Sequence, residues 1–268
     1  MSIRNVGKVY NPEGDRVVAL QGISLEIAAG EFCAIVGPSG CGKTTLLGIL
    51  AGFESPTSGQ IAMDGEVLAG PGKRLSPGAN RMVVFQQGAL FPWKTVLWNV
   101  TCGPVLQRRL PRDRAEADAR ELLARVGLDG IEHQYPGELS VGMRRRVEIV
   151  RALLNDPKVL LLDEPYRALD ALTKSVMHEC LLELYDLTKK TIFFVTHDLE
   201  EAIFLADRVV AMTTRPGRIK KVIQIDLPRP RDYRIVSSAH FGRLKQEAVD
   251  AIHEEARKAF EAGERELA

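Results

Sequence analysis

The sequence predicts an α/β fold with a mostly parallel core sheet. From 159 to 212, apolar runs of strand length alternate with segments of helical periodicity, a pattern typical of parallel strands joined by helices. Earlier in the chain, the apolar run Phe32–Val36 ends in a glycine-rich turn that opens a helix over Lys43–Ala51. Strand-like alternation before that turn adds an antiparallel β part at the N-terminal side.

The remaining elements follow from the same patterns. Strands are predicted over 17–27, 60–63, 81–86, 159–162, 191–195 and 209–212, and helices over 172–187 and 199–206. The Gly- and Pro-rich stretch 69–78 is predicted to be a loop. Segment 95–155 has helical patterns, and we interpret it as a helical lobe inserted in the core. Residues 1–227 then form the main domain, and 228–268 a C-terminal helical extension.

Composition excludes several classes of protein. The 268 residues include 36 Lys and Arg against 35 Asp and Glu, so no overall charge favours nucleic acid or an anionic membrane. The apolar runs are shorter than the roughly 20 residues of a membrane-spanning helix. The start of the chain lacks the pattern of a secretion signal, which favours the cytosol. Four cysteines without zinc-ligand spacing are expected to be reduced thiols.

The turn after the first buried strand has the chemistry of a phosphate-binding loop. Residues 37–44 fit the pattern GxxxxGK[ST] between a strand and a helix. The glycines let backbone N–H groups converge on phosphate oxygens, Lys43 reaches the β and γ phosphates, and Thr44 offers a hydroxyl to Mg²⁺. The expected ATP contacts are Gly37, Pro38, Ser39, Gly40, Cys41, Gly42, Lys43, Thr44 and Thr45. The helix start could lower the pKa of the Cys41 thiol and make it reactive, but a small space-filling role in the loop is the preferred interpretation.

Three further polar residues follow apolar strands. Asp163 and Glu164 end the run 159–162, at the edge where α/β sheets bind ligands. We expect Asp163 to hold Mg²⁺ and Glu164 to polarise the water that attacks the γ-phosphate. His197 follows the strand 191–195 and is expected to contact the γ-phosphate and that water.

Together these motifs resemble the ATP-binding cassette (ABC) family over residues 3–226. The resemblance implies that Gln86 contacts Mg²⁺ and water and relays the nucleotide state to a membrane subunit. It also identifies Asp170, in Ala168-Leu169-Asp170, as the D-loop aspartate, and Tyr10 as the aromatic residue that stacks on adenine.

The segment 139–143 stands where the family has its signature LSGGQ. In the family this motif caps the γ-phosphate bound by the opposite subunit, which implies that role for Ser140, Gly142 and Met143. Val141 departs from the pattern, because a glycine is usual there. If the backbone at this position needs a positive φ, valine would be strained there and the signature contacts could weaken. If the backbone is helical, the valine side chain adds only bulk.

Two neighbouring segments allow more than one interpretation. The run Arg144-Arg145-Arg146 could suggest nucleic acid, but a solvated or interface helix face is the preferred interpretation. The apolar segment 89–93 either belongs to the core or receives a short helix of the membrane partner, as it does in the family.

Segments 91–93, 207–219 and 226–231 resemble the nitrate, sulfonate and taurine importer branch. The resemblance implies an ATPase that uses ATP and Mg²⁺, works as a homodimer or paired cassette, and lies peripherally on the cytoplasmic face of the inner membrane. It also implies a membrane permease, an extracytoplasmic solute-binding protein and a small solute, with an anion the first choice. No nucleic acid partner is expected.

Three alternatives remain open from sequence. A soluble ABC protein acting on ribosomes or DNA usually has two cassettes, a long coiled coil or cluster-binding cysteines, which this sequence lacks. A GTPase or small-molecule kinase would not explain the segment Leu139-Ser140-Val141-Gly142. A cassette that binds ATP with weak turnover because of Val141 is the third.

Overall fold

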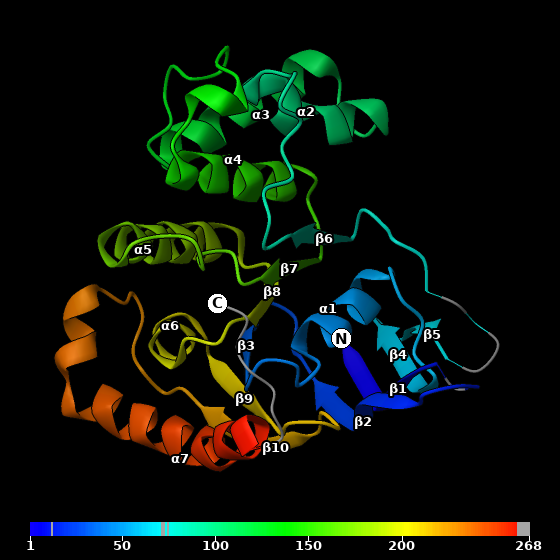
Figure 1. Cartoon of the computed structure of the whole chain (residues 1–268). Coiled ribbons are helices and arrows are strands. Elements are labelled where there is room, and N and C mark those ends of the chain that lie inside the picture. Colours follow the sequence, from blue (N-terminus) through cyan, green and yellow to red (C-terminus); the bar gives the residue numbers. More distant parts are fainter. Residues whose placement is uncertain (12, 71–72, 74, 262–268) are drawn as a thin grey trace. The chain divides into compact units, whose positions relative to one another are not determined.

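The computed structural model describes residues 1–11, 13–70, 73 and 75–261 (Figure 1). They fall into two compact units, unit 1 with residues 1–78 and 189–268, and unit 2 with residues 79–188.

Unit 1 contains an antiparallel and a mostly parallel sheet. Its elements are β1 (Ser2–Tyr10), β2 (Val17–Glu26), β3 (Phe32–Val36), α1 (Lys43–Ala51), β4 (Ser58–Met63), β5 (Glu66–Ala69), β8 (Thr191–Val195), α6 (Leu199–Leu205), β9 (Arg208–Met212), β10 (Ile219–Gln224), the 3-10 helix η2 (Tyr233–Ser237) and α7 (Ala239–Glu261). The antiparallel strands have the order β2-β1-β4-β5, and the others have the order β10-β9-β3-β8.

The parallel pair β3 and β8 forms the centre of the unit 1 core. Phe32 pairs with Ile192 and Ile35 with Val195. Both strands are buried along their whole length, as their uninterrupted apolar sequences predict for parallel strands covered on both faces. Their carboxyl ends lie at the same edge, and both strands lead there into loops that carry predicted site residues.

The helix α7 packs along α6, β9 and β10 (orange to red in Figure 1). Its buried residues recur every three or four positions, which is one face of an α-helix; they are Phe241, Leu244, Ala248, Ala251, Glu255 and Ala259. Before it, Arg231 donates to the carbonyls of Phe204 at 2.9 Å and Ala206 at 2.8 Å, where α6 ends. The tail is thus anchored to unit 1 by both apolar and polar contacts.

Unit 2 combines two parallel strands with a set of helices. Its elements are β6 (Arg81–Val84), α2 (Val96–Leu106), α3 (Arg112–Arg125), the 3-10 helix η1 (Pro136–Glu138), α4 (Val141–Leu154), β7 (Val159–Asp163) and α5 (Ala171–Thr188). Helices α2, α3 and α4 contact one another, and α4 also contacts β6 and α5. Strands β6 and β7 pair in parallel, so both end at one edge.

The predicted fold class is confirmed, and the predicted strands and helices are present with ends shifted by a few residues. Strands β5 and β10 were not predicted. The expected loop 69–78 overlaps β5 at Ala69, and its residues 71, 72 and 74 lie outside the described residues, as do residues 262–268 of the predicted extension. The boundary at 227/228 stays a prediction. In the described part of the chain, no helix is long and apolar enough to span a membrane.

Candidate functional site

The loop between β3 and α1 has the backbone geometry that its glycines predict. Gly40 has φ 74° and Gly42 has φ 95°, a left-handed region that glycine enters without strain. Gly42 is the N-cap of α1, so the amide groups of the first helical turn point into the loop. Residues 37–44, called the phosphate loop from here on, therefore present backbone donors and the positive end of a helix dipole to an anion.

Lys43 extends back into the phosphate loop. Its residue is 6% exposed, and its ammonium group donates to Gly37 O at 2.8 Å and Pro38 O at 3.0 Å. The ammonium group lies among backbone carbonyls next to the N-terminus of α1, so it can move to phosphate oxygens with little rearrangement of the side chain. This position matches the role predicted for Lys43.

The suggestion that Cys41 is a reactive thiol is wrong. Burial raises the pKa of the Cys41 thiol, and the nearby Lys43 lowers it only in part. A helix start depresses a thiol pKa only where solvent stabilises the thiolate as well, whereas Cys41 is 0% exposed. The complete burial of Cys41 supports the space-filling role, which is the interpretation that the sequence favours.

Tyr10 ends β1 close to the phosphate-loop helix. Its hydroxyl donates to Glu54 Oε2 at 2.6 Å and accepts from the Thr45 hydroxyl at 3.4 Å. Lys8 Nζ lies 4.9 Å from the ring centroid. Burial, together with the Glu54 carboxylate, raises the pKa of the Tyr10 phenol, so the hydroxyl stays protonated. These contacts place the ring beside Thr45 of α1, and its role in stacking on adenine stays a prediction.

His197 lies at the exposed bend between β8 and α6. The residues around it hold the bend in shape: Thr196 Oγ1 accepts from Asp198 N at 3.0 Å, and Asp198 caps α6 through Glu200 N at 3.0 Å. Since β8 is parallel to β3, His197 and the phosphate loop follow neighbouring strand ends of unit 1.

Asp163 and Glu164 stand at the carboxyl end of β7 in unit 2. Asp163 is 6% exposed. Glu164 has φ 41°, which is uncommon for a residue with a side chain. Its carboxylate lies 3.5 Å from the Arg167 guanidinium.

Gln86 is exposed just after β6, at the same strand edge as Asp163. Its backbone is held by Arg145, which donates to the carbonyls of Phe85, at 2.7 Å, and Gln86. Arg145 also pairs with Glu148 at 2.7 Å, and Glu148 accepts from Ala89 N at 2.6 Å. The buried pair Arg145–Glu148 thus shapes segment 85–89.

For Arg145, this arrangement corrects the interpretation of Arg144, Arg145 and Arg146 as a solvated or interface helix face; the other two are half-buried. The Arg145 side chain is 8% exposed, and its neighbours donate to the carbonyls of Leu139 and Val126, both at 2.6 Å. Sequence reasoning missed the role of Arg145 and Glu148. Their spacing of three residues on a helix was a signal for an ion pair, but nothing local indicated the carbonyls they reach.

The signature segment begins α4. Ser140 is the N-cap, and its hydroxyl accepts from Met143 N at 3.2 Å. Gly142 is buried, and a Cβ built on it would lie 3.1 Å from Thr173 Cγ2. The Asp170 carboxylate accepts from the Thr173 hydroxyl at 2.6 Å and from its N–H at 2.9 Å, and these bonds lower the pKa of Asp170.

The apolar segment 89–93 is not part of the core. Phe91 is 40% and Trp93 is 68% exposed. The buried Asn99 shapes the turn by accepting from Phe91 N at 2.8 Å and donating to Phe91 O and Lys94 O, both at 3.1 Å. Two large apolar side chains are thereby presented on a well-defined turn.

The predicted site residues form two sets. Unit 1 carries Tyr10, the phosphate loop with Thr45, and His197; unit 2 carries Gln86, Ser140, Gly142, Met143, Asp163, Glu164 and Asp170. Within the described residues, no group of three or more His, Cys, Asp or Glu side chains could hold a metal ion by itself.

The family model described as ABC transporter matches residues 20–167. The chain belongs to the ABC transporter family. The predicted family is therefore confirmed.

Curated relatives extend the ABC similarity over nearly the whole chain. An uncharacterised ABC transporter ATP-binding protein of Methanocaldococcus jannaschii is 45% identical over 97% of this chain and 94% of its own length. The aliphatic sulfonates import ATP-binding protein SsuB of Bacillus cereus is 44% identical over 86% of this chain and 88% of its own. The taurine import ATP-binding protein TauB of Roseobacter denitrificans is 44% identical over 94% of this chain and 93% of its own length.

A solved ABC cassette has the same fold. It is a dimeric post-hydrolysis state bound to ADP and Pi, 29% identical, with a TM-score of 0.72 over 85% of this chain and 99% of the other. The present chain is an ABC-type ATPase with the ATP-binding cassette fold.

Proposed function

We propose that this ABC ATPase energises an importer for a small anionic solute. The phosphate loop carries the ATPase part of the proposal, because left-handed Gly40 and Gly42 place the start of α1 and Lys43 at one turn. Such a turn suits the triphosphate of ATP, because backbone N–H groups and a lysine complement its negative charge. The relatives named for the import of aliphatic sulfonates and taurine support the importer and its anionic solute.

The residues available for Mg²⁺ are oxygen donors, which this hard cation prefers. Asp163 offers a buried carboxylate at the end of β7, and Gln86 an amide oxygen at the same strand edge. Thr44 offers its hydroxyl in the first turn of α1. This donor set fits Mg²⁺ with phosphate oxygens and water completing the shell. When bound, the ion would neutralise charge on the phosphates.

Hydrolysis needs an oriented water and stabilisation of the transferring phosphoryl group. We assign Glu164 to accept a proton from the attacking water, His197 to orient that water against the γ-phosphate, and Lys43 to neutralise charge developing on the phosphate oxygens. The places of Glu164 and His197, directly after the carboxyl ends of β7 and β8, support these roles, because α/β proteins bind ligands beyond the carboxyl ends of parallel strands.

Two cassettes are proposed to close on two ATP molecules. Each ATP is held by the phosphate loop of one subunit and by Ser140, Gly142 and Met143 of the other, with Asp170 at the same interface. The helix start capped by Ser140 supports this assignment, because it offers N–H donors to a γ-phosphate. The dimeric state of a solved relative supports closure, whether the partner is identical or a paralogue.

The other partners follow from the relatives' names. Import proteins for aliphatic sulfonates and taurine support a membrane permease, an extracytoplasmic solute-binding protein, and a peripheral position on the cytoplasmic face of the inner membrane. The exposed Phe91 and Trp93 are the surface that we assign to the permease, because large apolar side chains on a defined turn suit a helix docking there.

ATP turnover by Glu164→Gln tests the proposed catalytic role. The amide keeps the size of the side chain but cannot take a proton, so we expect turnover to fall at least about 100-fold while ATP binding persists. The ATP-bound variant should also form a dimer detectable by light scattering. The measurement is phosphate release at high protein concentration.

The matched control is Glu179→Gln, an exposed glutamate on α5 of the same unit. It should leave turnover and dimerisation as in the wild type. Full activity in Glu164→Gln would contradict the assignment of Glu164, and wild-type protein that neither binds nor hydrolyses ATP would contradict the proposed function.

A further inference from the structure

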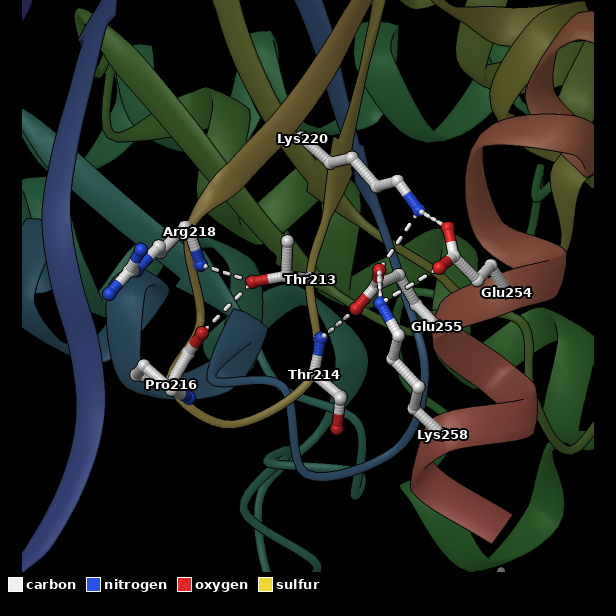
Figure 2. A network of polar contacts seen from close by, with 8 residues as sticks. All are labelled: Thr213, Thr214, Pro216, Arg218, Lys220, Glu254, Glu255 and Lys258. Atoms are coloured by element: carbon white, nitrogen blue, oxygen red, sulfur yellow. Dashed lines mark hydrogen bonds and ion pairs between the residues drawn. The ribbon is translucent and has the colours of Figure 1, made fainter. Parts of the chain in front are cut away.

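A buried carboxylate ties α7 to residues 213–218, called the β9–β10 loop from here on. The Glu255 side chain is 5% exposed. One oxygen accepts from the backbone N–H of Thr214 at 3.1 Å; the other accepts from Lys220 Nζ at 2.9 Å and Lys258 Nζ at 3.2 Å (Figure 2). The helix therefore holds the loop through a buried carboxylate, whose two lysine partners are partly exposed.

The Glu255 carboxylate is charged at neutral pH. Burial opposes its ionisation, but the hydrogen bonds from Lys220, Thr214 and Lys258 outweigh burial and hold the pKa of this carboxyl below its usual value. A paired, buried charge is costly to separate from its partners. The link between α7 and the loop is therefore expected to be persistent.

The β9–β10 loop is closed by its own hydrogen bonds. The Thr213 hydroxyl donates to Pro216 O at 2.9 Å and accepts from Arg218 N at 3.0 Å (Figure 2). Thr213 N also donates to Arg218 O at 2.9 Å. Thr214 lies inside this closed loop, so a displacement of Thr214 is expected to displace the whole loop.

The same loop touches the phosphate loop directly. Arg215 Nε donates to Gly40 O at 3.4 Å. A Cβ built on Gly217 would lie 2.1 Å from Cys41 O, so the two backbones are in contact with no room for a side chain. Gly217 N also donates to Ala19 O in β2 at 2.9 Å. The β9–β10 loop is thus packed between α7 and the phosphate loop.

The neighbouring Glu254 allows the role of Glu255 to be distinguished from that of an ordinary ion pair with the same lysines. It contacts the same two lysines, Lys220 at 3.2 Å and Lys258 at 3.1 Å, but its side chain is 56% exposed. Glu255 accepts the hydrogen bond from Thr214 N and is buried. The two glutamates therefore share their charge partners and differ in burial.

We propose that Glu255 is a positioning residue for the phosphate loop, acting from α7 through the β9–β10 loop. The proposal rests on the proposed ATPase function, because it assigns a role in holding the nucleotide. A phosphate loop binds through several N–H groups that must converge, so a small displacement of Gly40 or Cys41 weakens them together. The C-terminal helix then supports ATP binding without touching ATP.

The test compares Glu255→Gln with Glu254→Gln in the full chain. Hydrogen–deuterium exchange of residues 37–44 is measured without nucleotide, and ATP affinity, KM and kcat are measured with Mg²⁺. We expect Glu255→Gln to speed exchange in the phosphate loop and to weaken ATP binding about three- to tenfold, a typical coupling for residues along such a network. At saturating ATP, kcat should change by less than about twofold.

Glu254→Gln should leave phosphate-loop exchange and ATP affinity as in the wild type. The proposal is overturned if the two variants behave alike, or if Glu255→Gln changes exchange in α7 and leaves that of 37–44 unchanged. Because exchange is measured without nucleotide, wild-type protein that fails to bind ATP would count against the proposed function, while the exchange data would still decide the role of Glu255.

Arg215→Gln is a second variant that tests the same network if Glu255→Gln does not fold. Arg215 is exposed, and its substitution interrupts the network at the contact with Gly40. Faster exchange of the peptide that contains Gly40 is expected, with weaker ATP binding. Unchanged exchange and affinity in this variant would overturn the proposal.

Discussion

At the scale of single residues, Val141 illustrates how a backbone angle decides the effect of an unusual side chain. It is the first residue of α4, directly after the N-cap Ser140, and it is not among the residues with positive φ. Its side chain is 43% exposed. Of the two interpretations of this position, the backbone supports the one in which valine adds bulk without strain.

Replacing Val141 by glycine should therefore give no gain in folding or turnover. A helical backbone has no strain to relieve, and glycine is a poorer helix former than valine, so the free energy of unfolding should fall by about 0.5 kcal/mol or less. Phosphate release should stay within about twofold of the wild type. Chemical denaturation and ATPase assays check both values. A large rise in turnover would mean that the valine obstructs the signature contact.

At the scale of elements, α7 is more than an appended apolar helix. Its buried face carries one carboxylate, Glu255, among alanines, leucine and phenylalanine. An apolar face alone would let the helix slide or rotate, whereas the hydrogen bonds to Thr214, Lys220 and Lys258 set its register.

The docking of α7 should weaken in acid because of Glu255. Its pKa is held below the unfolded value of about 4.3. The stabilisation is therefore fully present above that unfolded value and is lost as pH falls through the lower folded value. At pH 7, Glu255→Gln should cost about 1 kcal/mol, a modest value because the lysines reach solvent.

The stability difference between wild type and Glu255→Gln should shrink as the pH falls below the unfolded pKa of this carboxyl toward its lower folded pKa. Chemical denaturation at several pH values, followed by circular dichroism, measures it. A difference that stays constant with pH would mean that the Glu255 charge does not stabilise the helix.

At the scale of the whole molecule, the predicted site residues are divided between two compact units. The phosphate loop, Tyr10 and His197 belong to unit 1, and Asp163, Glu164 and the signature segment belong to unit 2. A nucleotide that binds residues of both units stabilises the folded chain by its binding free energy.

ATP should accordingly raise the thermal unfolding midpoint. With free ATP at 100 times its Kd, the stabilisation is about 2.7 kcal/mol. Lys43→Ala should lose most of this increment, because the ammonium group that faces the phosphates is removed. Differential scanning fluorimetry with and without Mg²⁺ and ATP measures it. Lys221→Ala, an exposed lysine on β10, is the control and should keep the full increment.

The sequence alone determined the parts of this protein that depend on local patterns. Uninterrupted apolar runs identified β3, β7 and β8, because a strand buried on both faces needs no alternation. Glycine at 40 and 42 identified the phosphate-loop turn, because left-handed φ values favour glycine. The motifs that follow these strands also identified the family. Strands β5 and β10 were missed because they are short edge strands whose pairing, not composition, defines them.

Only the tertiary structure decided what depends on contacts between distant segments. Arg145 reaches Phe85 O across 60 residues, and Glu255 reaches Thr214 N across 41. In the sequence these residues look like surface charges, since neither a helical period nor a charge run indicates which backbone group a side chain will meet. Folding buries them and requires a partner for each charge, because an unpaired buried charge is costly. The contacts of Arg145 and Glu255 could therefore not be predicted from the sequence.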